Sequence, residues 1–175
     1  MNDMKYEVID NFLDKKYFND LVTLFMGRAM LWSFEPNVAN LREDIDIPKD
    51  DKLYYMTHTI YDDNLQRSDY YNIIVPFLQK LKVICLLRVK VNFYPNTEIL
   101  YEHPNHTDGN FVNSGAILSL NSCDGYTKLR DGTKIDSVAN RILLFDAHEE
   151  HCSTTTTNVT ARFNINVNYI QEQIL

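Results

Sequence analysis

Cysteine is scarce in this sequence. The 175 residues include three, Cys85, Cys123 and Cys152, which is an odd number at wide spacings. This count excludes the dense disulfide framework that holds many small secreted domains together. We therefore expect free thiols in a reducing compartment and a cytoplasmic protein, which would mean the host cytoplasm if a virus encodes the chain.

Long apolar runs are also missing. The longest, Val83–Leu87 and Ile142–Phe145, are far shorter than the ~18 residues that a membrane-spanning helix needs. The opening MNDMKYEVIDNF is acidic where a secretory signal would be basic and then apolar. The sequence therefore predicts no membrane association.

Positive charge is in the minority. Seventeen Lys and Arg residues stand against 24 Asp and Glu residues, giving a net charge of −7 and a pI near 5.1. A field of this sign repels phosphate backbones, so broad electrostatic binding to nucleic acid is disfavoured. The net charge does not exclude a local basic channel.

Glycine is scarce too, with five residues where a usual share of about 7% would give more than twice as many. Asparagine is abundant, and it tolerates left-handed backbone better than other residues with a side chain. We therefore predict that the following asparagines are turn residues: Asn96, Asn110, Asn121 and Asn140.

What is present suits an ordinary globular protein. Hydrophobic residues make up 45% and charged residues 23% of the chain, and its length suits one domain. Internal repeats and Pro/Gly/Ser-rich linkers are missing from the sequence. We expect a single domain over residues 1–175.

The pattern predicts helices early and strands later. Asp14 is expected to cap a helix that ends near Gly27, and Ser68 a second helix over 69–81 that contains Pro76. Strands are predicted at residues 5–9, 31–35, 53–61, 83–94, 116–121, 125–130, 133–138, 141–146 and 162–170. This order favours a mainly β, α+β fold that closes as a sandwich, jelly roll or barrel.

A histidine and an aspartate are spaced so that both could reach one metal ion. His106 and Asp108 are two residues apart, which puts their side chains on the same face of a strand. Alone this spacing is weak, but His151 follows a later predicted strand and Arg162 lies on the last one. Two imidazoles and one carboxylate form the facial site of non-haem Fe(II) oxygenases, and an arginine could grip a cosubstrate carboxylate.

At these residues the chain resembles the 2-oxoglutarate/Fe(II)-dependent dioxygenases, in particular their prolyl-4-hydroxylase-like branch. The resemblance covers most of the chain and rests on three segments: YEVIDNFLDKKYFNDLV, VKVNFYPNTEILYEHPNHTDG and ANRILLFDAHEEHCSTTTTNVTARFNINVNY. It implies a double-stranded β-helix (jelly roll) core with N-terminal helices packed on one sheet.

The resemblance also implies roles for particular residues. It makes His106, Asp108 and His151 the ligands of Fe(II), and it matches Arg162 to the residue that pairs with the distal carboxylate of 2-oxoglutarate. The positions implied to contact this cosubstrate further are Tyr94, Asn92 and Asn164.

The activity implied by the resemblance is oxidative. With O₂ and 2-oxoglutarate, the enzyme would hydroxylate a C–H bond and release succinate and CO₂, and ascorbate would restore over-oxidised iron. The expected substrate is a peptidyl residue, prolyl first, or a free amino acid. Substrate choice is expected to depend on the loops Asn37–Lys52 and Glu98–Asn105, while the sequence leaves the oligomeric state open.

The sequence departs from the family pattern at several positions. Asn140 stands where Gly is common, and Gly125-Tyr126 replaces a frequent Gly-Gly. Asn168 replaces the second arginine that oxidative DNA-repair demethylases of this superfamily carry on the last strand. This difference is a further argument against a nucleic-acid substrate.

Two alternatives stay open. The first is a non-redox zinc site built from the pairs His103-x-x-His106 and His148-x-x-His151 with Cys152. The strand period argues against this site. We predict that His103 and His148 are surface or supporting residues, and that Cys152, which is next to His151 and therefore on the opposite face of a strand, is a packing thiol. The second is a catalytically inactive jelly-roll binding module, because fold alone does not give activity.

Overall fold

The computed structural model describes residues 6–36 and 53–171, so the predicted specificity loop Asn37–Lys52 lies outside the described residues. In the described part, the chain forms two helices and eleven strands. They are β1 (Tyr6–Ile9), α1 (Lys15–Phe25), β2 (Ser33–Glu35), β3 (Tyr55–Asp62), β4 (Leu65–Gln66), α2 (Tyr71–Lys80), β5 (Val83–Pro95), β6 (Ser114–Ser119), β7 (Tyr126–Leu129), β8 (Lys134–Asp136), β9 (Ile142–Asp146), β10 (His151–Ser153) and β11 (Ala161–Gln171).

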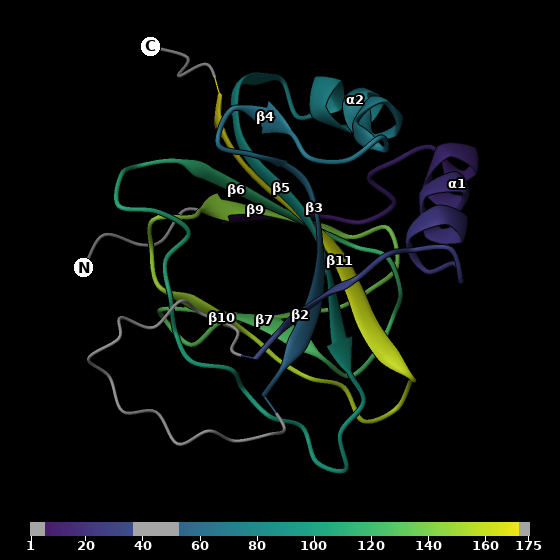
Figure 1. Cartoon of the computed structure of the whole chain (residues 1–175). Helices are drawn as coiled ribbons and strands as arrows, with labels where there is room; N and C mark the ends of the chain where they lie inside the picture. Colours follow the sequence, from purple (N-terminus) through teal and green to yellow (C-terminus); the bar gives the residue numbers. More distant parts are fainter. Residues whose placement is uncertain (1–5, 37–52, 172–175) are drawn as a thin grey trace.

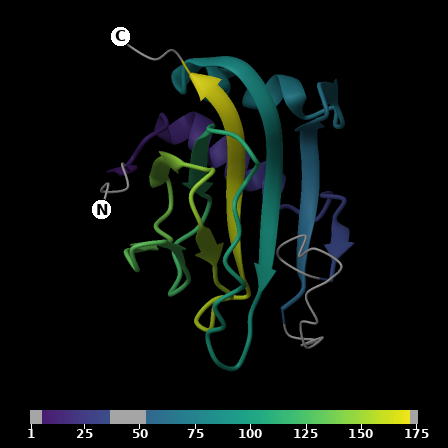
Figure 2. The same cartoon turned by 90° about the vertical axis from the view of Figure 1, so that its left-hand side faces the viewer.

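The strands make a large and a small antiparallel sheet that lie opposite each other (Figure 1). The large sheet has the order β1-β9-β6-β11-β5-β3-β2, with β4 paired to β3, and the small sheet has the order β10-β7-β8. Helices α1 and α2 cover the outer face of the large sheet. Figure 2 shows the side away from the helices, where the long strands β5 and β11 run next to each other.

The two long strands at the centre explain this layering. β5 and β11 pair in a register that sets Tyr94 opposite Arg162 and Asn92 opposite Asn164. Because side chains alternate along a strand, every second residue faces the helices and the others face the small sheet. The polar series Arg162, Asn164, Asn166 and Asn168 therefore shares one face with Arg88, Lys90, Asn92 and Tyr94.

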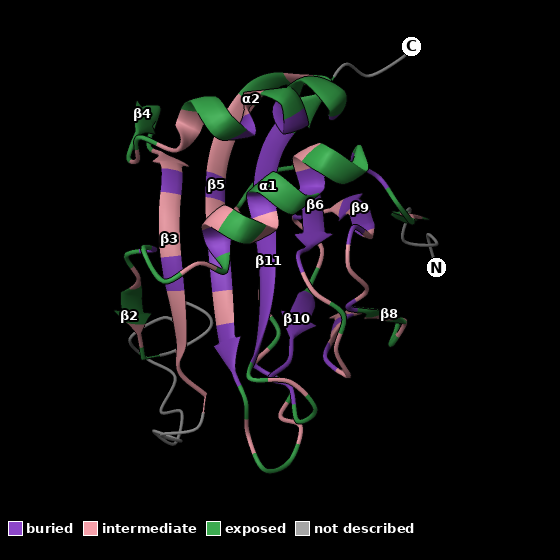
Figure 3. Ribbon diagram, turned by 90° about the vertical axis from the view of Figure 1, so that its right-hand side faces the viewer, coloured by how far each residue is buried: buried purple, intermediate pink, exposed green. Residues whose placement is uncertain are grey.

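The core lies between the large sheet and the helices (Figure 3). Its buried members from β5 and β11 are Val89, Val91, Ala161, Phe163, Ile165, Val167 and Tyr169, and those from the helices include Phe18, Leu21, Phe25, Ile74 and Phe77. The alternation of apolar and polar residues over 162–170 thus places the apolar face of this strand against the helices. The polar face is left for the space between the sheets.

The first helix begins as its sequence predicts. The Asp14 carboxylate accepts hydrogen bonds from the backbone N–H groups of Lys16 and Tyr17, at 2.9 and 3.3 Å. The predicted cap of the second helix is wrong. The N-cap of α2 is Tyr70, and no side chain caps this helix. Ser68 Oγ accepts a hydrogen bond from Tyr70 N, which lies ahead of the first helical residue.

One predicted turn asparagine has left-handed backbone. Asn140 has φ 60°, and its buried side chain accepts from Leu13 N and donates to Leu13 O. The other three, Asn96, Asn110 and Asn121, keep negative φ, and Asn121 instead bonds the chain around Ala161 and Phe163. The side chain of Asn140 therefore forms two hydrogen bonds that a glycine could not form, and they connect the segment before α1 to the loop that precedes β9.

Neither helix of the described residues is long and apolar enough to cross a membrane.

Candidate metal centre

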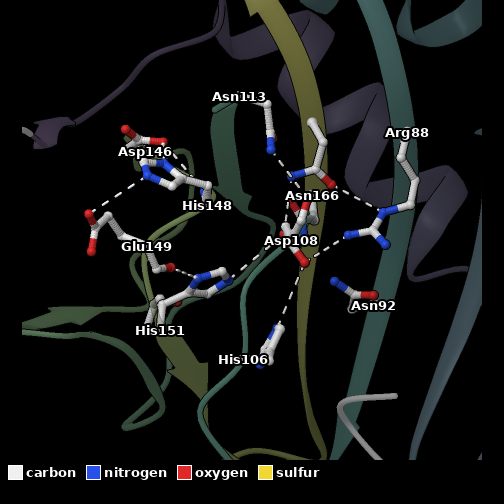
Figure 4. Close-up of polar contacts among 12 residues, drawn as sticks. Arg88, Asn92, His106, Asp108, Asn113, Asp146, His148, Glu149, His151 and Asn166 are labelled. Carbon is white, nitrogen blue, oxygen red and sulfur yellow. Dashed lines mark hydrogen bonds and ion pairs between the residues drawn. The ribbon is translucent and has the colours of Figure 1, made fainter. Parts of the chain in front are cut away.

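Backbone pairing brings the two histidines together. His106 N donates to His151 O and His151 N donates to His106 O, both at 2.9 Å, although the residues are far apart in the chain. Their rings lie 4.6 Å apart between centroids. Asp108 follows two residues after His106, and the three side chains offer ligand atoms that all lie within 4.8 Å of one another (Figure 4).

Each imidazole is oriented by a backbone carbonyl. His106 Nδ1 lies 3.3 Å from Pro104 O and His151 Nδ1 lies 3.0 Å from Glu149 O, which assigns the proton to Nδ1. Each Nε2 lies 3.8 Å from an oxygen of Asp108. Burial, and then the neighbouring His151, lower the pKa of His106 to about 4. The cluster therefore offers two imidazole nitrogens and one carboxylate to a metal ion.

Asp108 is held in place by three side chains. Arg88 Nη2 donates to Oδ1 at 2.7 Å, while Asn166 Nδ2 and Asn168 Nδ2 donate to Oδ2 at 3.0 and 3.1 Å. Arg88 Nε also donates to Asn168 Oδ1. Burial alone would raise the pKa of Asp108, but Arg88, the two histidines and Asn166 hold it well below its usual value. The carboxylate is therefore ionised and fixed before any ligand arrives.

The sequence reasoning missed these three supporting residues. Their signal in the sequence is the alternation of polar and apolar residues, which places Arg88 on the polar face of 83–94 and Asn166 and Asn168 on the polar face of 162–170. Which of those polar residues would meet Asp108 depended on strand pairing, which the pattern does not specify.

We expect Asn166→Ala to weaken metal binding without unfolding the protein. Asn166 contacts Asp108 but is not itself in the ligand cluster, and loss of such an orienting hydrogen bond typically costs about 10–100-fold in metal affinity. Competition for Mn²⁺ with a chelator measures the effect. Unchanged affinity would show that Arg88 and Asn168 suffice to orient Asp108.

Arg162 is the second feature of this site. It is 1% exposed, its guanidinium lies 5.3 Å from the centre of the Tyr94 ring, and it donates to Thr154 O at 3.3 Å and Thr127 Oγ1 at 3.0 Å. Its Nε has no partner, and no carboxylate pairs with it in residues 6–36 and 53–171. A buried cation with only neutral partners is costly, which indicates that an anionic ligand pairs with it.

The two predicted asparagines lie between Arg162 and the metal ligands. Asn92 Nδ2 donates to Asn164 Oδ1 at 2.9 Å, and both side chains are buried. Along β11, Asn164 separates Arg162 from Asn166, which contacts Asp108. Thr127, which the sequence reasoning did not assign to the site, contributes a hydroxyl from β7.

The other histidines do not complete a zinc site. His103 is 3% exposed and bonds Ser153, while His148 Nδ1 lies 2.5 Å from Asp146, an interaction that raises its pKa. The ligand cluster found among the described residues contains neither of them, nor Cys152. The tetrahedral site proposed from the two His-x-x-His pairs is therefore not assembled. His103 is also not a surface residue, because it packs under β10.

Gly125 leaves room for Arg162. A Cβ at this position would lie 2.7 Å from Thr155 O and 2.8 Å from Arg162 Cδ. We expect Gly125→Ala to displace the guanidinium and weaken binding of a dicarboxylate about 10-fold, while Mn²⁺ affinity stays near that of wild type. Calorimetric titration of each ligand measures the two effects, and equal losses of both would indicate general misfolding instead.

Comparisons with known proteins give a structural match only. No protein-family model matches the sequence, and a search of curated proteins finds no match. Solved structures do match. A prolyl-4-hydroxylase from Pseudomonas putida is 14% identical, with 97% of this chain and 94% of that chain covered and a TM-score of 0.57.

Two further structures are similar. A Trichoplax adhaerens prolyl hydroxylase, solved with a hypoxia inducible factor peptide fragment, is 16% identical over 97% of this chain and 85% of that chain, with a TM-score of 0.64. The viral collagen prolyl hydroxylase of Paramecium Bursaria Chlorella virus-1, solved with 2OG, is 14% identical over 95% and 96%, with a TM-score of 0.59. The sequence resemblance is thus confirmed at the level of fold: the chain has the jelly roll of the 2OG-Fe(II) oxygenases.

Proposed function

We propose that the protein is an Fe(II)- and 2-oxoglutarate-dependent dioxygenase that hydroxylates a C–H bond. The observation that carries this proposal is the combination of a His-Asp-His cluster with a buried guanidinium whose hydrogen-bond partners among the described residues are all neutral. Neither feature has an evident structural purpose alone. Together they fit a metal ion and a dicarboxylate bound between them.

The donor set fits Fe(II). Two neutral imidazoles and a carboxylate leave coordination positions for other ligands, whereas a structural zinc site would be closed by four protein ligands. His106, Asp108 and His151 would hold the ion. When bound, Fe(II) with 2-oxoglutarate supplies the activation of O₂.

The pocket around Arg162 fits the cosubstrate. Arg162 would pair with the distal carboxylate, with Thr127 and Tyr94 beside it and Asn92 and Asn164 along the path to the metal. Burial of these groups excludes water, which strengthens the ion pair. One oxygen atom of O₂ would enter the hydroxylated product and the other the succinate that forms as CO₂ leaves.

The proposed substrate is a peptidyl residue, prolyl first, or a free amino acid. The structure of the Trichoplax enzyme with a peptide fragment supports the peptide class, because that protein shares this fold. We also propose that the protein works in the cytoplasm and that ascorbate sustains its activity.

Anaerobic reconstitution tests the proposal. Fe(II) and 2-oxoglutarate together are expected to give a visible charge-transfer band that neither gives alone, and admission of O₂ should then yield succinate. Zn²⁺ in place of Fe(II) is the control and should give neither signal. Binding of metal without the band or succinate would favour the inactive binding module.

The substrate class can be screened in the same preparation. Proline, other amino acids and proline-containing peptides would be incubated with the reconstituted protein, and mass spectrometry would detect the gain of one oxygen atom. A gain on peptides but not on free amino acids would establish the peptidyl class.

A further inference from the structure

We propose that His103 donates a hydrogen bond from Nε2 to the distal carboxylate of the dicarboxylic cosubstrate, as a positioning residue beside Arg162. The inference rests on the proposed function, because it concerns the same pocket. It assigns a role to a histidine that lies outside the ligand cluster.

The starting observation is an unsatisfied buried nitrogen. His103 is 3% exposed, its Nδ1 lies 2.9 Å from Ser153 Oγ, and its Nε2 is sealed from solvent with no hydrogen-bond partner. Buried polar groups are nearly always paired, so an orphan of this kind calls for an explanation. Arg162 Nε is a second orphan in the same region.

The surroundings of His103 place it at the Arg162 pocket. Its ring centroid lies 5.3 Å from that of Tyr94, and the Arg162 guanidinium also lies 5.3 Å from the Tyr94 ring centroid. Ser153 fixes the histidine twice, because Ser153 O also accepts from His103 N at 2.9 Å. Ser153 lies two residues after His151 on β10, so this wall of the pocket is continuous with the metal centre.

The hydrogen-bonding chemistry sets the tautomer. Burial, and then the charge of Arg162, lower the pKa of His103 to about 3, so its ring is neutral at physiological pH. If Ser153 Oγ–H donates to Nδ1, Nε2 carries the proton and becomes a donor. A neutral donor adds a directed bond to a carboxylate and adds no second positive charge beside Arg162.

The burial of Nε2 also selects the ligand. A peptide substrate that docks from solvent would not reach a nitrogen sealed between Tyr94 and β10. A small dicarboxylate paired with Arg162 would need only a local shift of the surrounding side chains to reach it. We therefore assign His103 to the cosubstrate and not to the hydroxylated substrate.

A cycle of two variants and two ligands tests the role. Protein loaded with Mn²⁺ would be titrated by calorimetry with 2-oxoglutarate and with 2-oxovalerate, which lacks the distal carboxylate. His103→Phe keeps the ring that packs on Tyr94 but removes the donor, so 2-oxoglutarate should bind about 10-fold more weakly, as expected for one hydrogen bond to a charged group. Binding of 2-oxovalerate should not change.

A conservative variant provides the matched control. His103→Gln retains an N–H group and should restore most of the affinity for 2-oxoglutarate. Ser153→Ala leaves the imidazole in place but removes the hydrogen bond that sets its tautomer, so the affinity for 2-oxoglutarate should fall by a few-fold. This variant also tests the inference if His103→Phe does not fold.

The possible outcomes separate the inference from the function on which it rests. If both ligands lose affinity equally in His103→Phe, or if 2-oxoglutarate binds as in wild type, His103 does not contact the distal carboxylate and the inference is wrong. If wild-type protein binds no 2-oxoglutarate at all, the proposed function itself has failed.

Discussion

Asp108→Asn is expected to reduce metal affinity by more than about 100-fold and to abolish succinate formation, since loss of an orienting partner alone costs up to that factor. The variant replaces an anionic ligand with a neutral amide of the same shape. Its new NH₂ group would also face donors, because Arg88, Asn166 and Asn168 all donate to this side chain. Competition with a chelator for Mn²⁺ measures the loss.

The same substitution should also destabilise the metal-free protein. Arg88 would lose its only ion pair with a described residue, at a site where both side chains are largely buried. The folded protein holds the pKa of Asp108 below its unfolded value, so this carboxylate stabilises the fold above the unfolded pKa and ceases to do so as pH falls through the folded one. Wild type should therefore lose stability in acid more steeply than Asp108→Asn.

Asp10→Asn is the control for these effects. Asp10 also pairs with an arginine, Arg141, but it is exposed and far from the ligand cluster. We expect near-normal metal affinity and only a small change in unfolding temperature, because exposed ion pairs contribute little. A similar loss of metal affinity in both variants would contradict the assignment of Asp108 as a ligand.

Local pattern was enough to predict most of the elements. The apolar spacing of residues 17–25 behind Asp14 fixes α1, and strict alternation over 162–170 predicts β11 with the correct face toward the helices. The strands that the pattern missed, β4 and β10, have two and three residues. Such segments are too short to show a period, and their pairing with β3 and β7 defines them.

The residues of the candidate site were also predictable only in part. The spacing of His106 and Asp108 is visible in the sequence because both lie in one segment. The contacts of Arg88, Asn168 and His103 arise from the register of β5 with β11 and of the 102–106 segment with β10. Registers of distant strands are set by global packing, so the sequence showed polar faces but not which polar groups meet.

The fold alone does not determine which reaction the protein catalyses. A structure with the same fold is described as a non-heme alpha ketoglutarate dependent epimerase, SnoN, at 11% identity and a TM-score of 0.60. Its existence means that cosubstrate binding and hydroxylation need separate tests. Arg162 is the residue that addresses cosubstrate binding most directly.

Arg162→Met is expected to stabilise the ligand-free protein and to lower the affinity for 2-oxoglutarate by more than about 100-fold, the scale of a buried charge-assisted pair. The guanidinium is buried with Thr154 O and Thr127 Oγ1 as its only hydrogen-bond acceptors among the described residues. Methionine fills a similar volume without this cost of desolvation. The unfolding temperature should therefore rise without ligand, whereas 2-oxoglutarate should stabilise only the wild type.

The sign of the stability change decides what Arg162 does. A guanidinium that served only the fold would be supported by a carboxylate, and its removal would lower the unfolding temperature. A guanidinium kept for an anionic ligand is costly to bury without that ligand, and its removal stabilises the fold at the expense of binding. Thermal unfolding of both proteins, with and without 2-oxoglutarate, tests this directly: a destabilised Arg162→Met that still responds to the ligand would mean that the anion binds elsewhere.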